Sequence, residues 1–264
     1  MDVVDDEREA ELRWLIGYLE AERGVVGHAS SEEPERLWPH LRALMNVREP
    51  RPASDEFYAR QDRLLRVMAE EKGVVRATEL PRSDVDGHLS LWRGDITALE
   101  VDAIVNAANS QLLGCWVPGH HCIDNAIHSY AGVQLREECA RLMTAQGHEE
   151  LTGQAKLTSA YNLPARHVVH TVGPIAGGAP TRLHRSQLAD CYASCLDAVS
   201  EAGDRSVAFC CISTGLFGFP QEEAARIAVG SVRNWLDEHP GAVDQVVFNV
   251  FLARDEQIYR GLLG

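Results

Sequence analysis

The chain has 264 residues, of which 45% are hydrophobic and 24% are charged, and its formal net charge at pH 7 is −14. This length and composition are typical of a globular protein with one large domain, or with one domain and an extension. A protein that binds nucleic acid needs a basic face to displace counterions, and none is visible in so acidic a chain. We therefore expect no nucleic-acid partner.

The first residues and the cysteines both favour a cytoplasmic protein. The segment Met1–Glu7 is acidic, so it does not read as a secretory signal. No apolar run approaches the length of a membrane span, and we expect no membrane partner. The cysteine count of seven is odd, which makes a disulfide framework a poor expectation. We expect a monomer.

Residues 1–75 carry apolar side chains at helical spacing and predict three amphipathic helices. The first covers residues 8–23, the second follows a capping-box pattern of Ser30 and Glu33, and the third ends near Gly73. The apolar stripe of each helix must be buried against something. Two interpretations stay open: a structural cap on the following domain, or a docking surface for a substrate protein.

Residues 76–87 are polar, contain Pro81 and Gly87, and are predicted to be a linker. From residue 88 to residue 264, short β-branched runs alternate with helices of ten or more residues. This pattern predicts an α/β domain with a mixed or mostly parallel sheet and helices on both faces. We expect strands at 88–92, 101–105, 156–161, 167–171, 206–212 and 245–252, and helices at 123–146, 181–202, 220–238 and 255–263. In such sheets, ligands bind outside the carboxyl ends of the strands.

The loop after the strand predicted at 206–212 has the composition of an anion site. It runs through Ser213, Thr214, Gly215, Leu216, Phe217 and Gly218 and leads directly into a helix. Glycine lets backbone N–H groups converge on an anion, and the dipole of the following helix favours negative charge. We expect the loop to hold a diphosphate, with an ordinary strand-to-helix turn as the alternative.

Polar residues also follow the first two predicted strands. Asp95 can accept a hydrogen bond from an exocyclic amine such as that of adenine, or it can cap a helix or turn. Asn106 and Asn109 end a buried strand, where their amides suit a hydroxyl-rich ligand or bond the loop backbone. Asp124 is the next carboxylate and can orient a water or hold a ribose hydroxyl.

The segment from Gly114 to Asn125 holds two cysteines and two histidines in twelve residues. Thiolate and imidazole are the usual ligands of zinc. Cys115, Cys122 and one histidine can reach one ion and leave the fourth position open, as catalytic zinc sites do. If both histidines bind, the site is closed and structural, and a cluster without metal is the third possibility.

Several of these segments together resemble a macrodomain, over about residues 88–264. They are Gly94-Asp95-Ile96-Thr97, Val105-Asn106-Ala107-Ala108-Asn109, Leu113-Gly114, Ile123-Asp124-Asn125-Ala126-Ile127-His128, Ser213 to Pro220, and Leu252 to Glu256. The resemblance implies a three-layer α/β/α fold that binds ADP-ribose. Adenine would then meet Asp95 and Ile96, the diphosphate would lie on the loop from Ser213, and the distal ribose would meet Asn109 and Asp124. The ligand-binding residues carried over in this way are Asp95, Ile96, Asn106, Asn109, Ile123, Asp124, Asn125, Ser213, Thr214, Gly215, Leu216, Phe217 and Gly218.

The segment between Cys115 and Cys122 departs from the glycine run of ordinary hydrolytic macrodomains and resembles a zinc-containing subclass with a helical N-terminal extension. That resemblance implies one Zn²⁺ per chain, held by Cys115, His120 and Cys122 rather than by His121. It also implies hydrolysis of mono-ADP-ribose from protein side chains, with Asn109 and Asp124 as the catalytic residues. It further suggests a link to sirtuin-type transferases and to lipoyl-carrier proteins as substrates.

Two other functions fit the same residues. One is a non-catalytic ADP-ribose-binding module with a structural zinc, and the other is a hydrolase of a small ADP-ribose ester. Turnover of a modified protein, with and without a chelator, separates them.

Overall fold

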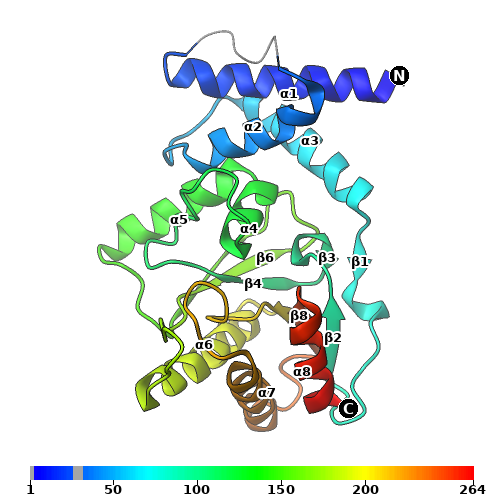
Figure 1. Cartoon of the computed structure of the whole chain (residues 1–264), viewed down its shortest axis with the longest axis vertical. Coiled ribbons are helices and arrows are strands. Elements are labelled where there is room, and N and C mark those ends of the chain that lie inside the picture. The colour runs from blue at the N-terminus through cyan, green and yellow to red at the C-terminus, as the bar shows by residue number, and fades with distance from the viewer. Residues whose placement is uncertain (1–2, 26–31) are drawn as a thin grey trace.

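The computed structural model of the protein describes residues 3–25 and 32–264. A six-stranded sheet lies at the centre of the larger, C-terminal part of the molecule (Figure 1). Its order is β2-β8-β7-β4-β6-β5, and all neighbours are parallel except β5, which pairs antiparallel with β6. The strands are β2 (Leu89–Arg93), β4 (Ala103–Ala107), β5 (Ala155–Ser159), β6 (His167–Thr171), β7 (Ser206–Phe209) and β8 (Gln245–Val250).

Helices cover both faces of this sheet. On the face nearer the N-terminal helices lie α4 (Ile123–Ala131) and α5 (Val133–Gln146) (Figure 1). On the other face lie α6 (Arg182–Glu201), α7 (Gln221–Glu238) and α8 (Ala253–Leu263) (Figure 1). The predicted three-layer α/β/α fold with a mixed sheet is therefore confirmed. Across residues 3–25 and 32–264, no helix has the length and apolarity needed to cross a membrane.

The predicted elements differ from the observed ones mainly at their ends. The strand predicted at 206–212 already ends at Phe209, which lengthens the loop that follows it. The helical region predicted at 123–146 is divided at Gly132, whose φ of +100° lies in the left-handed region. Glycine takes this conformation without the penalty that a Cβ imposes, so one helix can end there and the next can begin in a new direction.

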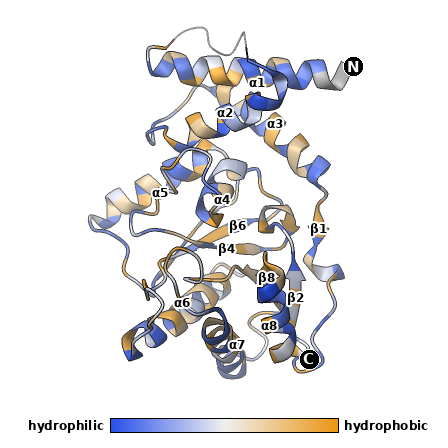
Figure 2. Ribbon diagram, in the orientation of Figure 1, coloured by the Kyte–Doolittle hydropathy of each residue, from blue (hydrophilic) through white to orange (hydrophobic). Residues whose placement is uncertain are grey.

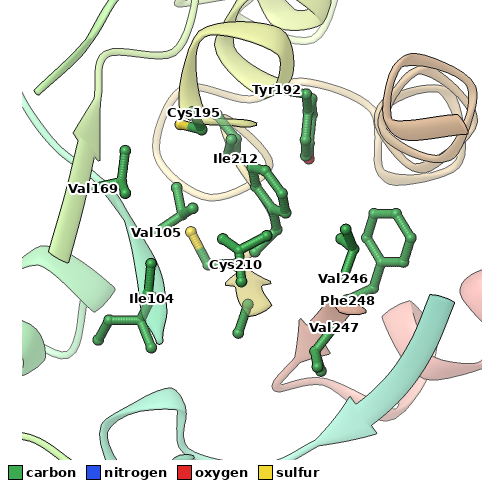
Figure 3. Packing of buried hydrophobic residues seen from close by; sticks show 14 of the residues in the cluster. Ile104, Val105, Val169, Tyr192, Cys195, Cys210, Ile212, Val246, Val247 and Phe248 are labelled. Atoms are coloured by element: carbon green, nitrogen blue, oxygen red, sulfur yellow. The ribbon is translucent and has the colours of Figure 1, made fainter. Parts of the chain in front are cut away.

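The core explains why several strands read as continuous apolar runs. Both faces of the sheet are covered, so both sets of alternating side chains are buried. Figure 3 shows Val105 of β4 beside Cys210 and Ile212, which continue the chain beyond β7. Cysteine acts here as a small hydrophobic residue. The buried cysteines are Cys139, Cys191, Cys195 and Cys210, while Cys211 is half-buried.

The N-terminal part consists of α1 (Val3–Glu22), α2 (Pro34–Asn46) and α3 (Asp55–Lys72). Their apolar stripes pack mainly against one another and against Val133 of α5, and make a second core separate from that of the sheet domain. Figure 2 shows hydrophobic residues alternating with hydrophilic ones along these helices. The fully buried side chains of this second core include Leu15, Ile16, Leu37, Leu41 and Phe57. The three helices are thus more than a cap that buries its apolar stripes on the sheet domain.

The capping box predicted before α2 has a different outcome for each member. Ser30 lies outside the described residues. Glu33 is the N-cap residue of α2, and its side chain makes no capping hydrogen bond.

The segment predicted as a linker, residues 76–87, packs against the sheet domain. It begins within β1 (Val75–Arg76), which pairs in parallel with β3 (Leu99–Glu100). Ala77 follows in a 3₁₀ turn, and its carbonyl accepts a hydrogen bond from the Gln245 amide at 2.8 Å. The connection therefore fixes where α3 ends relative to the sheet.

Candidate functional site

Four loops meet at one edge of the sheet, because each leaves the carboxyl end of a parallel strand. They follow β2, β4, β6 and β7. Backbone hydrogen bonds continue the strand pairing into them, from Ala108 N to Thr171 O at 2.9 Å and from Gly94 N to Val250 O at 3.0 Å. Most of the residues predicted to act lie on these loops or on the first turn of α4.

Asp124 lies at the start of α4 and is buried, with 5% of its surface exposed. Its Oδ1 accepts a hydrogen bond from Asn106 Nδ2 at 2.8 Å. Its Oδ2 accepts a longer hydrogen bond from Asn109 Nδ2 at 3.5 Å. Burial raises the pKa of Asp124 to about 6, against the opposing effects of the Asn106 hydrogen bond and the Arg136 charge. A carboxyl with this pKa can accept and release a proton near neutral pH, and Oδ2 is the oxygen left to do so.

Asn106 and Asn109 differ in what they touch. Asn106 is fully buried beneath Asp124, so its side chain acts on the site through that carboxylate. Asn109 accepts from Gln111 N and donates to Gly114 O, both at 3.0 Å, and so shapes the loop that follows β4. The loop-bonding alternative thus describes Asn109 in this structure, and its catalytic role stays a prediction.

Asn125 was expected to contact ligand, and its side chain does not face the site. It is fully buried, and its Nδ2 donates to Asn46 Oδ1 at 2.9 Å and to Val117 O at 3.0 Å. Its Oδ1 accepts from Arg42 at 2.7 Å. The amide is therefore fully used between α2 and the cysteine- and histidine-rich loop, and the expectation is corrected for this side chain. The neighbouring Ile123 is half-buried at the first position of α4.

The cysteine- and histidine-rich loop brings three donor atoms together. The ligand atoms of Cys115, His120 and Cys122 all lie within 4.8 Å of one another. Cys115 Sγ and His120 Nδ1 are 3.6 Å apart. Bonds of roughly 2.3 Å to sulfur and 2.0 Å to nitrogen separate two tetrahedral zinc ligands by about 3.5 Å. These residues therefore fit a zinc ion, while the exposed His121 lies outside the cluster.

The loop after β7 has the features of an anion cradle. Among the described residues, the backbone N–H groups of Gly215, Leu216 and Phe217 donate to no protein acceptor. Ser213 has φ +65°, rare for a residue with a Cβ, and its buried hydroxyl has no hydrogen-bond partner in the described part of the chain. Consecutive free amides and an unpaired buried hydroxyl are what a diphosphate would satisfy.

The remaining residues of that loop point outward or shape it. Leu216 is 84% exposed, and the Thr214 hydroxyl donates to Cys211 O at 3.0 Å. Gly218 has φ +65°, and a Cβ there would lie 3.2 Å from Gly178 N.

A second loop beside the cradle was missed by the sequence analysis. Ala176 N and Gly177 N donate to Phe217 O at 2.8 and 3.0 Å, and Gly178 N donates to Gly218 O at 2.7 Å. This loop follows β6, and its glycines after a predicted strand are the same signal that identified the cradle. The two loops brace each other, so the cradle is shaped by residues some 40 positions away in the sequence.

At the far end of the site, Asp95 has the capping role given as an alternative. Its Oδ1 accepts from Thr97 N at 3.0 Å at the start of the 3₁₀ turn Ile96–Ala98, in which Ile96 is buried. Its Oδ2 pairs with Lys72 Nζ at 2.8 Å, a partner that the sequence analysis missed. Burial alone would raise the pKa of Asp95, but the hydrogen bonds from Lys72 and Thr97 outweigh it and lower the pKa. The adenine contact stays a prediction.

A buried cluster beneath Asp124 was also missed. His128 Nε2 lies 3.6 Å from Asp124 Oδ1, and neither ring nitrogen of His128 has a hydrogen-bond partner among the described residues. His170 contacts Asn106, Thr158 and Cys139, and burial lowers its pKa to about 3. Both imidazoles are therefore neutral at pH 7, which avoids unpaired positive charge in the core.

Comparison with known proteins gives the same family in three ways. A family model described as Macro domain matches residues 105–228. The protein-ADP-ribose hydrolase of Treponema medium is 51% identical over 256 residues, which cover 95% of this chain and 97% of that protein. The protein-ADP-ribose hydrolase of Staphylococcus aureus (strain MRSA252) is 45% identical over 256 residues, with 96% and 94% covered.

Solved structures agree. The Trypanosoma brucei macrodomain in complex with ADP-ribose matches with a TM-score of 0.66 and 34% identity, covering 84% of this chain and 95% of that one. The Oceanobacillus iheyensis macrodomain with ADP matches with a TM-score of 0.59 and 38% identity, covering 66% and 88%. With its sheet order, its loops at one strand edge and these relatives, the chain belongs to the macrodomain family.

Proposed function

We propose that this protein is a hydrolase that removes mono-ADP-ribose from modified protein side chains, with a zinc ion held by Cys115, His120 and Cys122. The reaction is supported by relatives named protein-ADP-ribose hydrolase that are 45% and 51% identical over nearly the whole chain. The observation that supports the zinc dependence is the clustering of two thiol sulfurs and one imidazole nitrogen within 4.8 Å, on a loop that ends two residues before Asp124. Three protein ligands leave the open position of a catalytic zinc site.

The ligand proposed for the site is ADP-ribose. The 34% identical macrodomain of Trypanosoma brucei was solved in complex with ADP-ribose. In this chain, the free amides of Gly215, Leu216 and Phe217 suit the diphosphate, and the Ser213 hydroxyl supplies a further donor. The distal ribose then lies towards Asn109 and Asp124, and adenine towards Asp95 and Ile96.

The chemistry assigned to the chain is activation of water. Water adds to the anomeric carbon of the distal ribose, and the bond to the protein side chain breaks. Asp124 Oδ2 takes the proton of the attacking water, while Asn106 holds Oδ1 and so fixes the carboxylate plane. When bound, zinc would supply Lewis acidity and a template beside the reacting carbon. The proton on Asp124 then returns to solvent or to the leaving group.

The test is release of free ADP-ribose from a mono-ADP-ribosylated protein. We expect turnover by the zinc-loaded protein, and its loss in the zinc-stripped protein, in Cys122→Ala and in Asp124→Ala. ADP-ribose binding, followed by calorimetry, should persist in the stripped protein because the diphosphate loop does not depend on the metal. Full activity in all three altered forms would overturn the proposal.

The same assay separates the two other functions. Binding without turnover would indicate an ADP-ribose-binding module with a structural zinc, and turnover only of an acyl ester of ADP-ribose would indicate a small-molecule esterase. An ADP-ribosylated lipoyl-carrier protein is the substrate to try first, and a cytoplasmic monomer is the form we propose.

A further inference from the structure

The loop that carries the proposed zinc ligands has little structure of its own. Within residues 114–122, one backbone–backbone hydrogen bond joins two loop residues, from His120 N to Val117 O at 3.2 Å. Gly114 and Gly119 have φ of +77° and +64°, so the loop turns sharply at both points. A loop this short of internal hydrogen bonds needs outside contacts to hold one conformation.

Two of those contacts come from α2, about 75 residues earlier in the chain. Asn46 Oδ1 accepts from Gly119 N at 2.9 Å, and Arg42 Nη2 donates to His120 O at 2.9 Å. Arg42 and Asn46 are four residues apart, so both lie on one face of α2. That face therefore binds the backbone on each side of the peptide that joins Gly119 to His120.

The same two side chains also bind the first turns of α4. Arg42 donates to Asn125 Oδ1 through Nε at 3.0 Å and through Nη2 at 2.7 Å, and Asn46 Nδ2 donates to Ser129 Oγ at 3.1 Å. Asn125 N in turn lies 3.4 Å from Cys122 Sγ, at the N-cap of α4. One network thus joins α2 to the His120 carbonyl and to the backbone beside the Cys122 sulfur. Groups bonded to metal ligands in this way orient the ligands.

A further contact closes the network from α5. The Arg136 guanidinium lies 4.2 Å from the centre of the Trp116 ring. Its Nη1 donates to the carbonyls of Asn46 and Arg48 at 2.7 and 2.9 Å, at the C-terminal end of α2. A cation here satisfies carbonyls that the helix leaves unpaired and also stacks on the aromatic side chain of the loop.

The interface between α2 and the loop is polar, and its polarity indicates what the contact does. The apolar stripe of α2 is buried within the core of the N-terminal helices, and its Arg42 and Asn46 meet the sheet domain by hydrogen bonds. Hydrogen bonds are directional, so they fix relative positions in a way that non-directional apolar burial does not. An attachment that served stability alone would not need a polar face aimed at the loop backbone.

We propose that Arg42 and Asn46 are positioning residues of the metal centre, and that the N-terminal helices are therefore part of that centre. By holding the backbone at Gly119 and His120, they keep His120 Nδ1 beside the sulfurs of Cys115 and Cys122. This inference rests on the proposed zinc dependence.

The test measures zinc affinity in the full-length protein by competition with a chromophoric chelator. Arg42→Met and Asn46→Ala should weaken zinc binding by about 10- to 100-fold, as loss of a contact that orients metal ligands does elsewhere. The zinc affinity of Arg42→Lys should lie between those of the wild type and Arg42→Met, because lysine keeps the charge on one donor nitrogen but lacks the planar fork of the guanidinium. Arg36→Met is the matched control, since Arg36 is exposed on the same helix, and it should bind zinc as the wild type does.

Two further measurements separate positioning from simple loss of folding. ADP-ribose affinity should stay within about 2-fold of wild type in both Arg42 variants, because the diphosphate loop has its own supports. The melting temperatures of the zinc-free wild type and variants should also be compared, because a variant that fails to fold would lose zinc binding for that reason alone. Unchanged zinc affinity in folded Arg42→Met and Asn46→Ala would overturn the inference, as would equal losses in Arg36→Met or in ADP-ribose binding. If the wild type itself binds no zinc, the proposed metal centre fails first and the inference fails with it.

Discussion

Asn106 Nδ2 donates to Asp124 Oδ1 at 2.8 Å, and this bond orients a carboxylate that is almost entirely buried. The two residues come from different elements, the end of β4 and the start of α4. The pair shows how a side chain closed to ligand can set the geometry of the reacting group.

Asn106→Ala should lower hydrolysis of ADP-ribosylated protein by about 100-fold, because small misplacements of a catalytic group have effects of this size. ADP-ribose affinity should change by less than about 3-fold. Asn162→Ala is a matched control, because Asn162 is also buried but bonds Asp62 and Ala131 O instead. Wild-type turnover in Asn106→Ala would mean that Asp124 needs no such orientation.

His120→Ala should reduce zinc affinity by at least about 100-fold, more than the loss of a contact outside the ligand set. His121→Ala should leave zinc affinity unchanged, because His121 is exposed and outside the donor cluster. Metal content after dialysis against a weak chelator measures both. Equal losses in the two variants would indicate a closed site with four protein ligands.

Ser213→Gly should stabilise the protein and weaken ADP-ribose binding together. Glycine adopts a φ of +65° without strain and removes a buried hydroxyl that has no partner among the described residues. Relief of strain of about 1–3 kcal/mol exceeds the entropic cost of glycine in the unfolded chain, roughly 0.5–1 kcal/mol. We expect a higher free energy of unfolding in denaturant and an affinity about 10-fold lower by calorimetry, as for loss of one hydrogen bond to a charged ligand. A destabilised variant would show that the hydroxyl already has a partner in the free protein.

The free energy of unfolding should fall as the pH drops below the usual histidine range. Burial lowers the pKa of His170 from 6.5 to about 3 and that of His128 well below 6.5. The unfolded chain therefore binds more protons than the folded one in this window, so acid favours unfolding. Asp124 acts in the opposite sense between its usual 3.8 and about 6, because its pKa is raised on folding. Asp124 therefore offsets one histidine, and the second leaves a net loss of stability as the pH falls.

Denaturant unfolding of the zinc-free protein between pH 4.5 and pH 7 checks this slope. His170→Gln should flatten it by about 1.4 kcal/mol per pH unit, whatever the variant's absolute stability. His148→Gln should leave it unchanged, since His148 is exposed. Identical slopes in all three proteins would contradict the assignment of neutral buried histidines.

Much of the fold could be predicted because local patterns carried it. The β-branched runs of β4, β7 and β8 and the helical stripes around them identify the layers, and the glycine-containing loop after Ile212 predicts an anion site. The missed loop after β6 carried the same signal. The pairing of Lys72 with Asp95 has no signal in the sequence, because no local pattern relates a lysine at the end of a helix to an aspartate in a turn 23 positions later.

The chain alone determined which chemical groups are present and roughly where. Two cysteines and a histidine within eight residues stay near one another in any fold, because so short a loop cannot carry them far apart. Tertiary structure decided which histidine faces the cysteines, which oxygen of Asp124 is the more weakly bonded and what Asn125 touches. Those outcomes depend on α2, α5 and β6, which reach the site from far along the sequence. Burial then changes the proton affinities of groups that look ordinary when read from the chain.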